Sequence, residues 1–162
     1  MRMRLTCTLL VVIGVLAASG CGNQSVKSVS LTPQSMLSQD ATAQAQAALE
    51  SFFAAWESKD EVAAESHLPE YRHGGTWYFD RLDHVEFGPT SPDPSWIPEY
   101  MSNGMGSSTG AKADDIRCFQ ADATFYYTDP EYGPAPHGEP MEWHWFLERD
   151  GAGEWLVTDW GY

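Results

Sequence analysis

The sequence is poor in basic residues. Nine lysines and arginines stand against 23 aspartates and glutamates in 162 residues, giving a formal net charge of −14. A surface of this sign repels phosphate backbones, so we expect no nucleic-acid partner. The chain does not lack apolar residues, which make up 43% of it, with aromatics at 13%. That is enough for the core of one domain and excludes a wholly disordered chain.

Cysteine is also scarce. Cys7 and Cys21 lie in or directly after an N-terminal segment that we expect to be processed, which leaves Cys118 as the one remaining thiol. A domain with a single cysteine has no internal disulfide, so packing must hold it together. Cys118 lies in an apolar, strand-like stretch and is expected to be a small buried side chain, not a nucleophile.

The apolar run near the N-terminus is too short to span a membrane. It covers 10 residues, Leu9–Ala18, whereas a spanning helix needs about 20. Arg2 and Arg4 precede the run, and small residues follow it. A charged start, a short apolar run and small residues are typical of a secretory signal peptide, here residues 1–20.

Ala18-Ser19-Gly20-Cys21 resembles the lipobox of bacterial lipoproteins. The resemblance implies cleavage before Cys21, lipidation of its thiol and acylation of the new N-terminus. Two or three acyl chains anchor stably where one does not. We therefore expect a lipid-anchored protein on the extracytoplasmic face of a bacterial membrane. Residues 21–38 would be the lipidated cysteine and a flexible tether, and residues 39–162 a single domain.

Two helices are predicted in the first half of this domain. The first covers residues 40–58, where four large apolar residues recur on one face with a period of 3.6: Leu49, Phe52, Phe53 and Trp56. Pro33 could open this helix earlier, because proline is tolerated at a first helical position. Asp60 is a candidate N-cap for a second helix over residues 61–67, which Pro69 ends.

The rest of the pattern is β. Strands are predicted over residues 82–87, 116–128, 141–149 and 154–162, with a four-residue hairpin loop between the last two. The region after residue 88 is rich in proline and glycine, which favours loops. Its Gly104-x-Gly106 spacing neither follows a strand nor opens a helix, so it does not indicate a phosphate-binding loop.

Symmetric closure of the hairpin predicts its register. Pairing Arg149 with Glu154 places residue 143 opposite 160, 145 opposite 158 and 147 opposite 156 on one apolar face. On the other face, His144 falls opposite Asp159.

The order of elements resembles the nuclear-transport-factor-2-like cone fold, the superfamily of ketosteroid isomerase and the SnoaL-like proteins. Three segments carry the resemblance: residues 48–56, the Lys59-Asp60 junction and residues 154–161. It covers residues 40–162 and is nearest to lipoproteins of this superfamily. It implies an α+β fold in which N-terminal helices pack in a strongly curved antiparallel sheet, leaving a conical cavity. That cavity binds small molecules, is catalytic, or packs against a partner in different members.

The His144–Asp159 pair is the catalytic candidate. A carboxylate that accepts a hydrogen bond from an imidazole fixes its tautomer and raises its basicity, which suits a general base. The other interpretation is a cross-strand polar pair on a half-exposed face. Isomerase-like chemistry, as the resemblance implies, would also need an oxyanion donor such as Tyr126 or Tyr127.

Aromatic side chains are the candidates for ligand binding, because they stack on rings; they also commonly pack a core. The candidates are Trp143, Trp145, Tyr126 and Trp160. The histidines lack the spacing of a metal site, so no metal or cofactor is expected.

Three functions remain open at this point. The first is a non-enzymatic lipoprotein that binds a small hydrophobic ligand or an envelope protein. The second is a SnoaL-like isomerase, dehydratase or hydrolase that uses His144 and Asp159. The third is a docking domain whose cone is filled by its own tryptophans, with a homodimer as one possible assembly.

Overall fold

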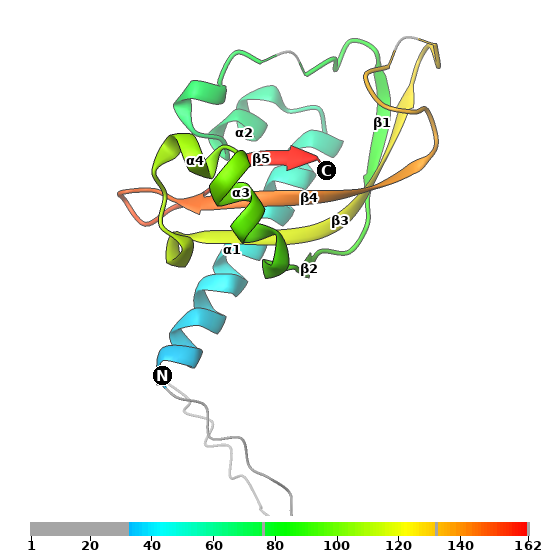
Figure 1. Ribbon diagram of the computed structural model, residues 1–162. Helices are drawn as coiled ribbons and strands as arrows, with labels where there is room; N and C mark the ends of the chain where they lie inside the picture. Colours follow the sequence, from blue (N-terminus) through cyan, green and yellow to red (C-terminus); the bar gives the residue numbers. More distant parts are fainter. Residues whose placement is uncertain (1–32, 76, 132, 162) are drawn as a thin grey trace, which may run out of the picture. The chain divides into compact units, whose positions relative to one another are not determined.

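The computed structural model describes residues 33–75, 77–131 and 133–161, with side chains from residue 39 onward. Its first element is helix α1, Pro33–Glu57, which begins six residues before the predicted domain boundary and so includes the end of the predicted tether. The predicted signal peptide and Cys21 lie outside the described residues. Figure 1 shows α1 crossing one face of a sheet while α3 and α4 lie against the other.

The predicted second helix is confirmed. Helix α2 spans Glu61–Ser66, and the Asp60 carboxylate accepts a hydrogen bond from the Ala63 amide at 3.0 Å, as an N-cap should. The remaining helices are short: α3 (Ile97–Asn103), α4 (Gly106–Thr109) and the 3-10 helices η1 (Glu70–Arg72), η2 (Pro94–Trp96) and η3 (Ala113–Asp115). Most of these fall in the region whose composition predicted only loops.

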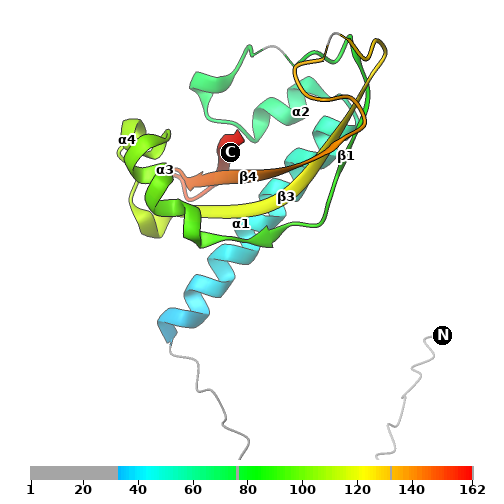
Figure 2. The same ribbon diagram turned by 45° about the vertical axis from the view of Figure 1, so that its right-hand side comes forward.

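The strands form one antiparallel sheet in the order β1-β3-β4-β5, with β2 also pairing with β3. Their bounds are Leu82–Phe87 (β1), Ser91–Pro92 (β2), Ile116–Tyr127 (β3), Pro140–Arg149 (β4) and Trp155–Gly161 (β5). Figure 2 shows the sheet curling strongly around the C-terminal half of α1. The fold is therefore α+β with a curled antiparallel sheet, as predicted.

The concave face of the sheet holds the main core. Helix α1 contributes the predicted apolar stripe, in which Leu49 and Phe52 are fully buried. Odd-numbered residues of β3 and β4 meet it, because successive side chains of a strand point to opposite faces. The largest of them is Trp145, which is fully buried.

A second core lies on the opposite face, under α3. The Tyr100 ring stacks on Phe146 at 4.3 Å between centroids, and its hydroxyl donates to Glu148 at 2.6 Å. A Cβ at Gly104 or Gly106 would lie 2.9 Å or less from the Tyr100 ring. These glycines therefore let the α3–α4 turn close on the tyrosine, which explains their spacing without a phosphate.

The predicted register of the hairpin is wrong. Arg149 pairs with Trp155, and a bulge between Phe146 and Leu147 shifts the register again, so that Trp145 lies opposite Trp160. At the bulge, the buried Thr158 hydroxyl donates to the Phe146 carbonyl at 3.2 Å and contacts the hydroxyl of Tyr100 at 2.8 Å. A long-range polar contact thus accompanies a register shift that local closure does not predict.

The burial of Phe52 gives a stability prediction. Its ring contacts four tryptophan and phenylalanine neighbours within α1 and the sheet and is fully buried. We expect Phe52→Ala to lower the free energy of unfolding by about 3–5 kcal/mol in chemical denaturation, because it leaves a cavity. Val62→Ala, at a side chain that is 80% exposed, is the control and should stay within about 0.5 kcal/mol of wild type. Similar losses in both variants would contradict this core.

Candidate functional site

A cavity of about 210 Å³ lies between helix α1 and the concave face of the sheet. Seven of the described residues that line it are aromatic, and none of the described lining residues carries a charge at neutral pH. The lining consists of Trp56, Trp77, Tyr78, Leu82, Phe125, Tyr127, Pro134, Ala135, Trp143 and Trp160. They come from α1, all four long strands and two loops.

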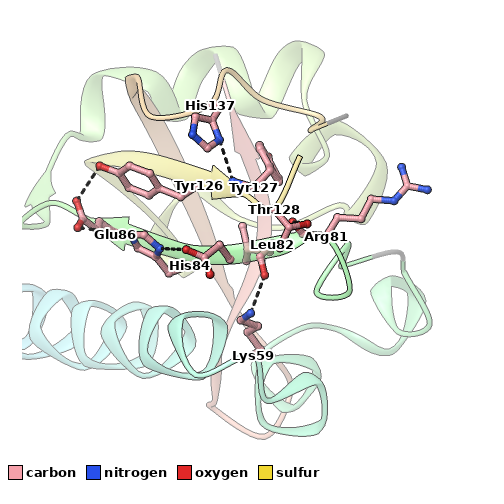
Figure 3. Close-up of polar contacts among 10 residues, drawn as sticks. Lys59, Arg81, Leu82, His84, Glu86, Tyr126, Tyr127, Thr128 and His137 are labelled. Carbon is pink, nitrogen blue, oxygen red and sulfur yellow. Dashed lines mark hydrogen bonds and ion pairs between the residues drawn. The ribbon is translucent and has the colours of Figure 1, made fainter. Parts of the chain in front are cut away.

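One of these loops, residues 133–139, is tied to the end of β3. The His137 Nδ1 accepts a hydrogen bond from the Tyr127 amide at 3.0 Å, as Figure 3 shows, and the Gly138 amide donates to the Phe125 carbonyl at 2.8 Å. A Cβ at Gly133 would lie 2.0 Å from the Tyr127 ring, so only glycine lets the backbone pass there. These contacts place Pro134 and Ala135 at the cavity.

The other lining segments are anchored by charged side chains that lie outside the cavity lining. Lys59 Nζ donates to the Leu82 carbonyl at 2.6 Å and joins the α1–α2 junction to β1 (Figure 3). Arg72 donates to the Asp159 carboxylate at 2.8 Å, and its guanidinium lies 5.1 Å from the ring centroid of Trp160. Arg72 thereby joins η1 to β5 and covers one tryptophan of the cavity.

The polar side-chain groups of the lining are the indole N–H donors of Trp56 and Trp77 and the hydroxyls of Tyr78 and Tyr127, which can donate or accept. The indole Nε1 atoms of Trp56 and Trp77 and the hydroxyl of Tyr127 are buried and have no hydrogen-bond partner. Trp145, which does not line the cavity, instead donates its Nε1 proton to the Ala121 carbonyl at 3.4 Å. Burial raises the pKa of the Tyr127 phenol, which keeps it neutral. The cavity is therefore lined by mainly apolar, uncharged side chains, and three polar atoms of these residues lack a hydrogen-bond partner.

The structure brings together two of the four predicted ligand-binding residues. Trp143 and Trp160 line the cavity. Trp145 is fully buried and packs the core. Tyr126 lies on the opposite face of the sheet, where its ring stacks on His84 at 4.2 Å between centroids. The tyrosine that lines the cavity is its neighbour, Tyr127.

The predicted His144–Asp159 pair does not form. In the observed register His144 lies opposite Gly161, and Asp159 lies opposite Phe146. Asp159 instead accepts from Arg72, and neither member of the predicted pair lines the cavity. The one-residue shift at the hairpin loop and the further shift at the bulge thus together remove the catalytic arrangement that the sequence predicted.

His144 is a buried structural side chain, 3% exposed. Its Nε2–H donates to the Asp93 carboxylate at 3.2 Å, and its ring lies 4.5 Å from that of Trp96. Asp93 also accepts from the amide and hydroxyl of Ser95 and so caps η2. These contacts hold the η2–α3 segment against the sheet.

Cys118 is confirmed as a buried side chain. It is 3% exposed, and burial, with a smaller effect from Asp93, raises the pKa of its thiol to about 12. A thiol in this state is a poor nucleophile.

The described residues hold neither a cluster of metal ligands nor a helix that could span a membrane. No group of three or more histidine, cysteine, aspartate or glutamate side chains in this part of the chain could hold a metal ion. Within the same residues, no helix is long and apolar enough to cross a bilayer.

Comparison with family models, with curated proteins and with solved structures gave no match to this chain.

Asp93 gives a pH prediction. Hydrogen bonds, first from the Ser95 hydroxyl, hold the pKa of its carboxyl below the ordinary value of 3.8. A carboxyl whose pKa is lower in the folded state stabilises that state above the ordinary pKa, and the effect is lost as pH falls through the folded pKa. We expect Asp93→Asn to be less stable than wild type at pH 7 and to approach it as the pH falls below the ordinary pKa of 3.8, in urea denaturation. Asp122→Asn, at an exposed residue of β3, is the control. A constant difference across the pH range would contradict this role.

Proposed function

We propose that this domain binds a small, uncharged apolar molecule in the aromatic cavity. The observation that carries the proposal is a cavity of about 210 Å³ lined by four tryptophans and by no charged side chain among the described residues. An apolar cavity of about 150 Å³ is enough for benzene, and sites for drug-sized ligands start near 300 Å³. The size therefore favours a ligand of one ring or a small bicyclic system.

The cone-fold superfamily remains part of the proposal. An N-terminal helix pair, an antiparallel sheet curled around α1 and a cavity between them support this membership. Such a fold accommodates binding proteins and enzymes alike, so the cavity's own chemistry must decide between them.

The other two hypotheses have less support. The enzyme hypothesis loses its general base, because His144 and Asp159 are apart and outside the cavity lining. The docking hypothesis needs a cone that its own side chains fill. Trp145 does fill the centre, but space remains at the end that loops 77–81 and 133–139 border.

We propose in addition that Cys21 carries the lipid that anchors the protein outside the cytoplasmic membrane. The support is the lipobox-like sequence 18–21 after an apolar run of signal-peptide length. A tethered binding domain of this kind would capture its ligand at the envelope.

Toluene is a direct probe of the cavity. A ligand that binds only the folded state raises stability, by about 2.7 kcal/mol at 100 times its Kd. We expect toluene to raise the Tm of the purified full chain and to change its tryptophan fluorescence. Ala135→Phe would fill the cavity and abolish both effects. Ala152→Phe, in the exposed hairpin loop, should keep them. Equal responses of the two variants would place toluene elsewhere and contradict the proposal.

The anchor is tested by Cys21→Ala in a bacterial host. We expect labelled palmitate to be incorporated into the unmodified chain and not into the variant, because the acylated thiol is lost. Cys7→Ala, inside the predicted signal peptide, is the matched control and should still incorporate the label. Incorporation into Cys21→Ala equal to that into the control would refute lipidation at this residue.

A further inference from the structure

We infer that the ligand of the aromatic cavity carries a hydrogen-bond acceptor, such as a carbonyl or ether oxygen, that receives the indole N–H of Trp56 or Trp77. This inference rests on the proposed function and specifies its ligand class as a neutral ring compound with an acceptor group.

The first argument is the state of the two indoles. Trp56 is 7% exposed, and the Nε1 atoms of Trp56 and Trp77 are both buried without a partner. A buried donor that gives up water without gaining an acceptor costs free energy, so native structures leave few of them. Here two occur on adjacent rings, 5.4 Å apart between centroids and nearly perpendicular, and both rings line the same cavity. An acceptor on the ligand would satisfy at least one of them.

The second argument concerns charge. An anionic ligand would lose its hydration in a cavity whose described lining offers no cation, and the chain as a whole carries a net charge of −14. A neutral acceptor avoids both costs. This excludes a carboxylate as the favoured acceptor and leaves carbonyl, ether or similar oxygen.

A cationic ligand is the main competitor, because cages of aromatic rings bind quaternary ammonium groups through their faces. The guanidinium of Arg72 already lies over Trp160, 5.1 Å from its centroid. Indole N–H groups also present positive partial charge, which repels a cation and attracts an acceptor. The observed donors therefore favour the neutral ligand.

Two probes of nearly the same shape test the inference. Acetophenone has a carbonyl oxygen where α-methylstyrene has a methylene group, so only the first can accept a hydrogen bond. In the purified full chain we expect acetophenone to bind at least about tenfold more tightly by tryptophan fluorescence, since one satisfied buried donor is worth this much. The preference for acetophenone over α-methylstyrene should shrink in Trp56→Phe or in Trp77→Phe, whichever variant removes the donor that the carbonyl uses; an unchanged preference in both would contradict the acceptor.

Indole ¹H–¹⁵N NMR signals locate the contact. We expect acetophenone to shift the N–H signal of Trp56 or Trp77 downfield. Two internal controls should not move in this way: Trp145, whose N–H is bonded to Ala121, and Trp155, whose buried N–H lacks a partner but lies outside the cavity lining.

The outcomes separate the two proposals. Equal affinity for both probes, with unmoved Trp56 and Trp77 signals, would overturn the acceptor and leave the cavity as a ligand site. Tighter binding of phenyltrimethylammonium than of acetophenone would overturn the neutral ligand in favour of a cation. Failure of both probes and of toluene would remove the cavity as a ligand site altogether.

Discussion

Trp145 lies where helix α1, strand β1 and the β4–β5 hairpin converge, and the fold depends on its burial. It is fully buried, and its indole N–H reaches the backbone of the neighbouring strand β3. A flat sheet could not cover so large a side chain on all sides, whereas a curled sheet with a helix in its concave face can. Six aromatic rings contact it: Phe52, Phe53, Trp56, Phe87, Trp143 and Trp160.

The same crowding produces the cavity. Large rigid rings that meet at tilted and perpendicular angles around one centre do not fill space beyond it, because they have few rotamers with which to adjust. At the end of the core that Trp77 and Ala135 border, the rings therefore leave a space of about 210 Å³. The indole donors of that end have no backbone carbonyl to reach, unlike Trp145. The packing of these rigid aromatic rings thus accounts both for the size of the cavity and for the indole donors without partners beside it.

Local patterns in the sequence predict the parts of the fold that local physics decides. Residue patterns predict the apolar stripe from Leu49 to Trp56 and strand β1. The N-cap depends on a contact between Asp60 and an amide only three residues away. All three predictions are confirmed. The hairpin register was not predictable in this way. Thr158 sits at a bulge where it contacts Tyr100, a residue 58 positions earlier in a segment without periodicity. Because the shift at the hairpin loop and the bulge together place His144 opposite Gly161 instead of Asp159, the error in register was also the error in the catalytic candidate.

The lining of the cavity likewise combines residues whose positions follow from local sequence patterns with residues whose positions follow from contacts distant in the sequence. One part of its lining, with Trp56, Trp143 and Trp160, comes from periodic elements, so a pattern can place these rings on the concave face. Another part comes from residues 77–81 and 133–139, which have no period, and their position follows from contacts such as that of Gly133 with the Tyr127 ring. The periodic elements thus supply aromatic rings that a pattern can predict, whereas Trp77, from the segment without a period, adds a buried indole donor without a partner that no pattern predicts.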